Sequence, residues 1–247
     1  MSQITQAAVA NAHAVFHSPH YLRHNMRRQE HLASLGLDLY GKSVLELGAG
    51  IGDHTTFFLD RGCTVVAVEP RAENCALFHS IMGSYSAAKP GSPQRVTMVR
   101  SDVESFDQFI KDQFEIVYCY GLLYHVADPD KALVTMAKAC KGLFLLETCV
   151  SYGSHEAINQ VVEPSSPSQA FHDAGCRPTR PWLFNKMKSL FPHVYTPRTQ
   201  PAHEQFPLDW TKQPAGNEFT RAVFIGSREP INNPLLADHL PERQTLA

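Results

Sequence analysis

Val44-Leu45-Glu46-Leu47-Gly48-Ala49-Gly50-Ile51-Gly52-Asp53-His54-Thr55 is the stretch that decides the fold of this chain. Its first residues form a short apolar run that leads into three glycines at alternate positions, and a helix-forming run follows at residues 56–61. Glycines in such a turn allow positive φ and let a ligand approach the backbone, while the start of the helix offers unpaired N–H groups. The order of strand, tight turn and helix predicts a binding loop for a polar ligand.

A second apolar run, residues 63–68, leads to Glu69, at a distance from the glycines that is typical of nucleotide-binding units. In such a unit, an acid at this place accepts hydrogen bonds from ribose hydroxyls. The glycine triplet alone is a weak signal, because glycine-rich turns also occur as plain connections between elements. The glycines and the acid together predict a ligand that contains a nucleoside.

The spacing of the glycines separates this loop from the nicotinamide dinucleotide fingerprint, which has glycines at its first, third and sixth positions. Here the order is Glu46-x-Gly48-x-Gly50-x-Gly52. A carboxylate at Glu46 would repel a pyrophosphate but can hold an ammonium group or a sulfonium-bearing amino acid. The stretch resembles the first motif of the class I S-adenosylmethionine (SAM) methyltransferases, and the resemblance extends over residues 42–148.

The resemblance implies an α/β fold, a doubly wound and mostly parallel sheet of seven strands with an antiparallel last strand, preceded by an N-terminal helical cover. The run at residues 114–121 is apolar enough to be buried on both faces, as a central parallel strand should be. The expected strands are residues 44–47, 63–69, 96–100, 114–121, 143–148, 193–196 and 221–227. The expected helices are residues 18–35, 70–78, 129–139 and 181–191, with an exposed loop at residues 84–95.

Three parts are expected along the chain. Residues 1–40 would form a helical extension or lid, and residues 41–229 the SAM-binding domain. Residues 230–247, rich in prolines, asparagines and charges, would form a flexible tail. Regular periodicity is lost at about residues 149–180 and 197–217, and long irregular segments inside a compact domain are often binding loops.

The resemblance also implies which residues hold the cofactor. Glu69 would bind the ribose, Asp102 the adenine amino group, and Val103 the edge of the ring. Asp102 could instead cap the next helix, and both roles can hold at once. The residues expected to bind SAM and its product S-adenosylhomocysteine (SAH) are Tyr21, Glu46, Gly48, Ala49, Gly50, Gly52, Glu69, Pro70, Asp102, Val103, Tyr120 and Gly121.

The chemistry is expected after the strand at residues 114–121, because open α/β sheets bind ligands outside the carboxyl ends of their strands. His125 is the best-placed titratable group there, and with Tyr124 it is the catalytic candidate. A neutral histidine is a suitable base for a hydroxyl acceptor, whereas a carboxylate or a thiolate acceptor needs none. The alternative is that His125 only forms a hydrogen-bonded wall of the pocket.

An anionic acceptor would need cationic anchors. Arg177 and Arg180 are the candidates, together with His155, because guanidinium groups clamp carboxylates and phosphates with two hydrogen bonds. Arginines that cap a helix are the competing explanation. His20 and His24 would share a helix face, but no third ligand is evident nearby, so no metal site is predicted.

Composition narrows the class of protein. The chain has 247 residues, a hydrophobic fraction of 43% and a net charge of −2, which suits one α/β domain and gives no broad basic field for nucleic acid. Its six cysteines contain no Cys-x-x-Cys pair, so reduced thiols in the cytoplasm are expected. No membrane segment or export signal is predicted. We expect a monomer or a homodimer.

The leading functional hypothesis is methyl transfer from SAM to a small molecule, at the oxygen of a hydroxyl or carboxylate in a bacterial-type metabolite, natural product or sugar. The first alternative is an RNA (tRNA) or protein methyltransferase. It predicts a basic strip beside the pocket, formed by Arg23, Arg27, Arg28 and Arg71. The second alternative is a non-catalytic scaffold with the SAM fold, which would have no chemical need for the acids Glu46, Glu69 and Asp102.

Overall fold

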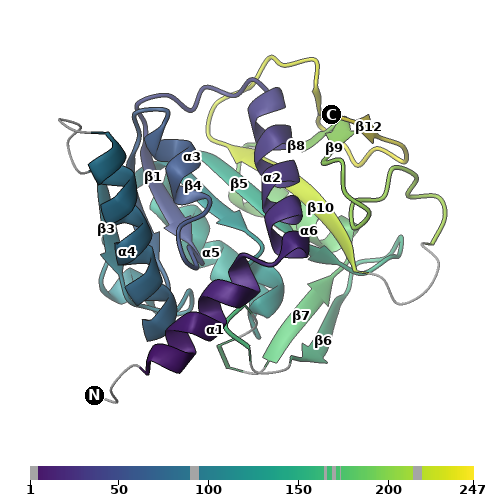
Figure 1. Ribbon diagram of the computed structural model, residues 1–247. Helices are drawn as coiled ribbons and strands as arrows, with labels where there is room; N and C mark the ends of the chain where they lie inside the picture. Colours follow the sequence, from purple (N-terminus) through teal and green to yellow (C-terminus); the bar gives the residue numbers. More distant parts are fainter. Residues whose placement is uncertain (1–4, 90–94, 164–165, 169–170, 173, 214–218) are drawn as a thin grey trace.

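The computed structural model describes the chain apart from residues 1–4, 90–94, 164–165, 169–170, 173 and 214–218. Figure 1 shows a central sheet with helices on both faces and two N-terminal helices that cross over one of them. The expected α/β fold with an N-terminal helical cover is therefore confirmed. The helices are α1 (Gln6–Phe16), α2 (Pro19–Ser34), α3 (Thr55–Leu59), α4 (Ala72–Ala88), α5 (Pro129–Ala139) and α6 (Arg180–Leu190), with short 3-10 turns η1 (Phe106–Gln108) and η2 (Leu123–His125).

The main sheet has eight strands in the order β11-β8-β10-β5-β4-β1-β2-β3. Adjacent strands from β3 to β5 are parallel, while β10 is antiparallel to both β5 and β8. The expected seven strands are present, and a short eighth strand, β11, extends the edge beside β8. The strands are β1 (Ser43–Leu47), β2 (Thr64–Val68), β3 (Val96–Val99), β4 (Phe114–Tyr120), β5 (Cys140–Val150), β8 (His193–Pro197), β10 (Thr220–Ser227) and β11 (Leu236–Ala237).

Local capping chemistry sets the starts of two helices. The Ser18 hydroxyl accepts the Tyr21 N–H at 3.4 Å at the start of α2, and the Asp128 carboxylate accepts the Lys131 N–H at 3.0 Å at the start of α5. A proline occupies the first helical position in both, where its missing N–H does no harm. The predicted exposed loop at residues 84–95 was partly wrong, because α4 continues to Ala88.

Two apolar layers cover the faces of the sheet. Phe58 of α3 and Phe78 of α4 belong to one layer, and both side chains are almost completely buried. Leu133 of α5 and Leu183 of α6 belong to the other. The central strand β4 is buried along nearly its whole length between these layers, as its continuous apolar sequence predicted.

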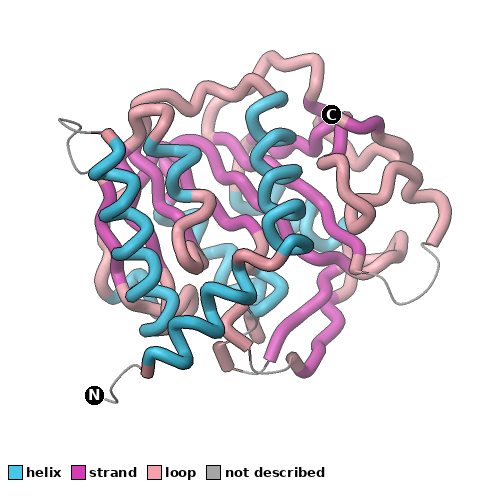
Figure 2. Tube along the Cα trace, viewed as in Figure 1, coloured by secondary structure: helices cyan, strands magenta, loops and turns pink. Residues whose placement is uncertain are grey.

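Residues 149–180 are more regular than expected. They contain an antiparallel hairpin, β6 (Ile158–Val162) paired with β7 (Ala174–Pro178). A bridge between Ser151 and Thr179 connects the base of this hairpin to the end of β5. Figure 2 shows the hairpin at the same end of the molecule as α1. The prediction of an irregular segment was wrong because the glycines, prolines and serines around the hairpin obscure two short strands.

Residues 230–247 are packed against the fold and do not form the flexible tail that their composition suggested. Strand β11 pairs with β8, and β12 (Thr245–Leu246) pairs with β9 (Thr199–Gln200). The Trp210 indole N–H donates to the Gln244 side-chain oxygen at 2.7 Å. The tail is therefore held by main-chain pairing and by the insertion that begins at residue 197.

Two further sequence expectations can be compared with the structure. All six cysteines are free and buried, which agrees with the expectation of reduced thiols. Within the described part of the chain, no helix has both the length and the apolar character needed to cross a bilayer.

Candidate active site

The glycine loop lies at the carboxyl end of β1, beside the end of β2. The N–H groups of Gly48 and Ala49 donate to the Val68 carbonyl at 2.9 and 3.0 Å, which holds the loop against β2. Gly48 has φ 70° and Gly50 has φ 56°, a region that favours glycine. A Cβ atom at Gly50 would lie 2.9 Å from Cε1 of Phe16, so the loop is closely covered by the end of α1.

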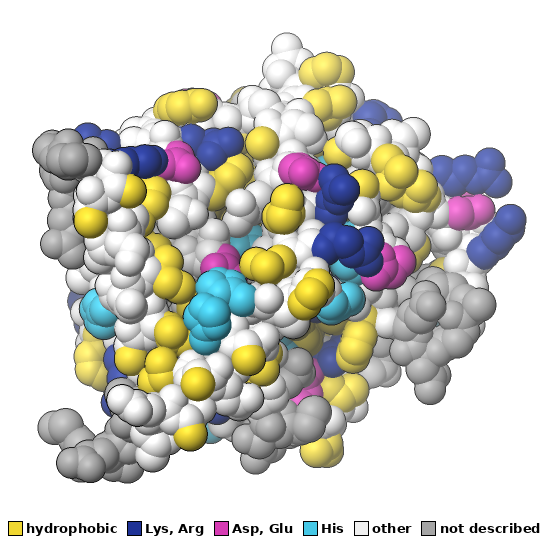
Figure 3. Space-filling model, in the orientation of Figure 1, with side chains coloured by type: hydrophobic (Ala, Val, Ile, Leu, Met, Phe, Trp, Pro, Cys, Tyr) yellow, Lys and Arg dark blue, Asp and Glu magenta, His cyan; other side chains and the backbone are white. Residues whose placement is uncertain are grey.

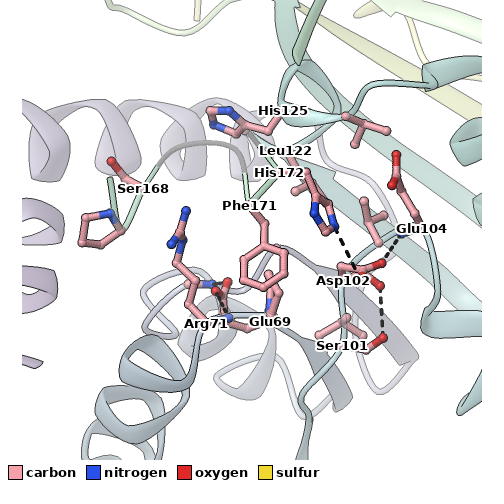
Figure 4. A pocket seen from close by; sticks show the side chains of 18 of the residues that line it. Glu69, Arg71, Ser101, Asp102, Glu104, Leu122, His125, Ser168, Phe171 and His172 are labelled. Atoms are coloured by element: carbon pink, nitrogen blue, oxygen red, sulfur yellow. Dashed lines mark hydrogen bonds and ion pairs between the residues drawn. The ribbon is translucent and has the colours of Figure 1, made fainter. Parts of the chain in front are cut away.

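A larger cavity opens beside this loop, with apolar side chains and a few polar groups in its lining, as in small-molecule sites. In the view of Figure 4, Glu69 and His125 lie on opposite sides of it, with Phe171 between them. Its lining includes the predicted cofactor residues Tyr21, Gly48, Gly50, Glu69, Pro70, Asp102, Val103 and Gly121.

Glu69 follows the end of β2 and is held by several donors. Its carboxylate accepts the Gly50 N–H at 3.1 Å, the Arg71 N–H at 3.0 Å and the Asn74 amide at 3.0 Å. Burial raises the pKa of this carboxyl, and the three hydrogen bonds oppose the shift. The carboxylate thus links the glycine loop to the start of α4, at the place where the resemblance puts the ribose.

Asp102 lines the larger cavity and also organises the turn after β3. Its Oδ1 accepts the Glu104 N–H at 2.9 Å and the Ser105 hydroxyl at 2.8 Å, while its Oδ2 lies 4.0 Å from Nε2 of His172 (Figure 4). Asp102 thus faces the cavity and fixes the turn before η1, but it does not cap that helix: Ser105 is the N-cap of η1, and no side chain caps it.

A smaller cavity adjoins the larger one, and Tyr21 and Gly50 line both. Three more predicted residues line it, namely Glu46, Ala49 and Tyr120. Its lining also includes Asn25, Arg28, Asp53, His54 and Tyr118.

Glu46 carries the most unusual carboxyl group of the smaller cavity. The residue is 2% exposed, and its Oε2 accepts the Thr55 hydroxyl at 2.6 Å. Burial raises its pKa to about 8, although the Thr55 hydrogen bond opposes this shift. At neutral pH the group therefore holds a proton unless a cation is placed beside it.

Gly52 does not line either cavity, in contrast to its predicted cofactor role. It has φ 96°, and a Cβ atom there would lie 2.9 Å from Met82 and 2.9 Å from Phe78. Its lack of a side chain allows the loop to pack against α4 instead. The third glycine of the triplet thus serves the packing of the fold.

His125 is the last residue of η2, directly after β4, and lines the larger cavity. Its side chain is 7% exposed, and its Nδ1 contacts the Glu163 carboxylate. Its Nε2 is buried and has no hydrogen-bond partner among the described residues. Burial lowers the pKa of His125, against the opposing effect of Glu163. The lowered pKa favours the neutral form of this histidine near pH 7.

Tyr124, the other catalytic candidate, lines neither cavity. Its hydroxyl accepts a hydrogen bond from Nη2 of Arg221 at 3.1 Å, and its carbonyl accepts one from Nη1 of Arg177 at 3.0 Å. Burial raises the pKa of this phenol. The geometry therefore gives Tyr124 a supporting place behind His125.

The three predicted acceptor anchors, like Tyr124, line neither of the two cavities. Arg177 donates from Nη2 to Glu163 at 2.8 Å. Arg180 donates to the Pro241 carbonyl at 3.2 Å and lies 3.8 Å over the Trp210 ring, and burial lowers its pKa to about 10. His155 is exposed and lines neither cavity. The explanation of Arg177 and Arg180 as structural arginines fits these contacts better.

A buried ion cluster beside the smaller cavity was missed from the sequence. The Glu147 carboxylate at the end of β5 accepts Nη1 of Arg28 at 2.8 Å and Nη1 of Arg221 at 3.0 Å. All three side chains are less than 10% exposed. Of the three residues, Arg28 alone was singled out from the sequence, as part of the basic strip beside the pocket that the RNA or protein alternative predicts.

The histidines of α2 meet partners far away in sequence. His20, His203 and Glu204 bring potential ligand atoms within 4.8 Å of one another. Arg23 already donates to both oxygens of Glu204 at 2.5 Å, and Nδ1 of His203 accepts the N–H of Gln205 at 3.3 Å, which leaves the ring proton on Nε2. These contacts oppose cation binding, and the absence of a metal stays a prediction.

Comparison with known proteins gives the family. The family described as "Methyltransferase domain" matches residues 7–203, and no curated protein matches the chain significantly. The N-terminal domain of EvdMO1, crystallised in the presence of SAH and D-fucose, is similar with a TM-score of 0.63 and 22% identity, covering 85% of this chain and 84% of that one. The glycopeptide N-methyltransferase MtfA complexed with SAM has a TM-score of 0.52 and 18% identity, covering 82% and 86%. Because the family match spans most of the sequence and SAM- and SAH-bound enzymes share the fold, the chain belongs to the class I SAM-dependent methyltransferases.

Proposed function

We propose that this enzyme transfers the methyl group of SAM to a hydroxyl group of a small, uncharged molecule, with His125 as the general base. The observation that carries the proposal is that His125 lines the larger cavity while its Nε2 has no hydrogen-bond partner among the described residues. A hydroxyl must lose its proton as its oxygen is methylated, and a neutral imidazole can take that proton. A carboxylate acceptor has no proton to lose, so it would not need a base at this nitrogen.

The residues that line the two cavities suit the chemistry of the cofactor. Glu69 and Asp102 would hold the adenosine part in the larger cavity, while Glu46 and Arg28 would face the amino and carboxylate groups in the smaller one. SAM, when bound, supplies a methyl group that is already activated on a sulfonium. The chain therefore has to align the acceptor, exclude water and accept one proton at Nε2 of His125.

The surroundings of His125 favour an uncharged acceptor. Two arginines, Arg177 and Arg221, lower the pKa of His125. Each is already paired with a glutamate and is therefore not free to bind an anionic acceptor. Apolar side chains near it, including Leu122 and Val126, line the same cavity. A neighbour crystallised with D-fucose makes a sugar hydroxyl one reasonable example of this class, although the likeness to that domain concerns the fold.

The hypothesis of an RNA or protein methyltransferase receives less support. It predicted a basic strip of four arginines, but Arg23 pairs with Glu204, Arg27 with Glu30, and Arg28 is buried against Glu147. Of the four, Arg71 lines the larger cavity. Figure 3 shows blue and magenta side chains next to each other on this face, as such pairs require. Neutralised arginines provide little attraction for a phosphate backbone.

The first test measures cofactor binding by titration calorimetry with SAH, using NAD as the control ligand. We expect micromolar affinity for SAH alone. Glu69→Ala should weaken SAH binding at least tenfold, about 1.4 kcal/mol, since it removes the carboxylate expected at the ribose. Unchanged affinity in a folded Glu69→Ala variant would remove the ribose assignment.

The second test separates catalysis from binding. His125→Gln should bind SAH like the unmodified enzyme and transfer labelled methyl groups to hydroxyl compounds at least about a hundredfold more slowly. A parallel panel of carboxylate compounds tests the competing acceptor class. Transfer that is retained in His125→Gln would exclude the base role, and the absence of transfer to both panels would favour a scaffold.

A further inference from the structure

The partner of His125 comes from a separate part of the chain. Glu163 directly follows β6 of the hairpin, 38 residues beyond His125, and its side chain is 3% exposed. Its Oε2 contacts Nδ1 of His125, and its Oε1 accepts Nη2 of Arg177 at 2.8 Å. The hairpin thus delivers a buried carboxylate to the back of the histidine ring, on the side opposite the free nitrogen.

The charge state of Glu163 determines which nitrogen of His125 carries the proton. Burial raises the pKa of Glu163, but the contacts with His125 and Arg177 outweigh burial and hold it below its ordinary value. An ionised carboxylate can only accept hydrogen bonds, so Nδ1 of a neutral His125 must be the donor. Nε2 then carries the lone pair.

The hairpin makes room for this contact at Gly175 of β7. A Cβ atom there would lie 2.9 Å from Oε1 of Glu163 and 2.5 Å from the carbonyl oxygen of Tyr124. A larger residue would therefore push the hairpin away from η2 and remove Glu163 from His125. The glycine allows the carboxylate to reach the ring.

We propose that Glu163 is a positioning residue of the methyl transfer, which holds His125 with Nδ1 protonated and Nε2 turned to the acceptor hydroxyl. This inference rests on the proposed base role of His125. In the transfer, the acceptor oxygen bonds to the methyl carbon, the sulfur–carbon bond breaks, and the hydroxyl proton passes to Nε2. Glu163 stabilises the imidazolium that results, because its negative charge lies beside Nδ1–H.

The charged groups around His125 predict shifts of its pKa in opposite directions for Glu163→Gln and Arg177→Gln. Glu163 raises the pKa of His125, whereas Arg177 of β7 and Arg221 of β10 lower it. Glu163→Gln keeps an oxygen that can accept from Nδ1–H of His125 but removes the negative charge of Glu163. The pKa of His125 should therefore fall by about one pH unit. Arg177→Gln removes a positive charge behind the same carboxylate, so that pKa should rise.

The experiment is nuclear magnetic resonance of the full chain labelled with ¹⁵N histidine, with and without SAH. The His125 signals are identified by their loss in His125→Gln. We expect the unmodified protein to show a protonated Nδ1 and an unprotonated Nε2, and Glu163→Gln to keep this tautomer. Glu163→Ala should give a mixture of tautomers. Glu156→Gln, on an exposed glutamate that accepts from Asn185, is the matched control and should change nothing.

The outcomes are distinguishable from those of the proposed function. An Nε2–H tautomer in the unmodified protein would overturn the role of Glu163, and so would an unaltered His125 tautomer and titration in both Glu163 variants. Shifts of the same sign in Glu163→Gln and Arg177→Gln would show general loosening and would also overturn it. Failure to bind SAH would instead contradict the proposed function, since the tautomer is measured in the free protein as well.

Discussion

At the scale of single residues, the buried carboxyl of Glu46 connects the glycine loop to the cofactor. Its pKa is raised to about 8 by burial, so the free enzyme keeps it largely protonated at pH 7. SAM brings an amino group and a sulfonium, and either cation would favour the ionised carboxylate. Cofactor binding and proton release are therefore expected to be coupled at this residue.

This coupling can be measured at pH 7 by calorimetric titration with SAM in two buffers of different ionisation enthalpy. We predict the release of a substantial fraction of one proton, because binding lowers the pKa of Glu46 from about 8 to below the working pH. Above about pH 9 the release should disappear, since the carboxyl is already ionised in the free enzyme. Glu46→Gln should abolish it, and equal apparent enthalpies in both buffers would contradict the assignment.

At the scale of elements, α1 ends over the cofactor cleft. Phe16, its last residue, lines both cavities and packs edge-to-face on Tyr21, with ring centroids 5.1 Å apart. Phe16 is 6% exposed. The helix end thus provides an apolar cover that would exclude water from the reacting groups.

Phe16→Ala should open this cover and weaken SAH binding by roughly tenfold to a hundredfold, mainly through faster dissociation, because it removes about 1.5–3 kcal/mol of apolar contact. Stopped-flow measurement of SAH release tests this expectation. The matched control is Phe109→Ala, on a side chain that is 66% exposed and lines neither cavity. An equal effect of both variants would mean that Phe16 acts through general stability and not as a cover.

Elements with local signals could be predicted, and elements that depend on distant pairing could not. The start of α2 follows from Ser18 and its neighbouring proline, and the glycine loop from its own spacing. The hairpin escaped prediction because β6 and β7 are short and each is stabilised by the other. Glu163 was missed for the same reason, since only the register of that hairpin brings it to His125.

At the scale of the whole molecule, one buried ion cluster ties together parts that are far apart in sequence. Arg28 comes from α2, Glu147 from β5 and Arg221 from β10. The cluster lies next to the smaller cavity, because Arg28 also lines that cavity. The division near residue 40 between the helical cover and the SAM-binding domain stays a prediction. Arg28 belongs to the cover, but its side chain is buried against Glu147 of the domain.

Glu147→Gln should lower the free energy of unfolding at pH 7 by about 3–5 kcal/mol, since it leaves two buried guanidinium groups without their counter-charge. Urea denaturation measures this loss, and Glu30→Gln is the matched control, because the Glu30–Arg27 pair is exposed and worth about 1 kcal/mol or less.

Burial raises the pKa of Glu147, but Arg221 and Arg28 hold it below its ordinary value. Its stabilisation is therefore present above about pH 4.5 and is lost as the pH falls through the lower, folded-state value. The difference in the free energy of unfolding between Glu147→Gln and the unmodified enzyme should accordingly shrink in acid. A difference that stays constant with pH would show that the charge of Glu147 does not hold these three elements together.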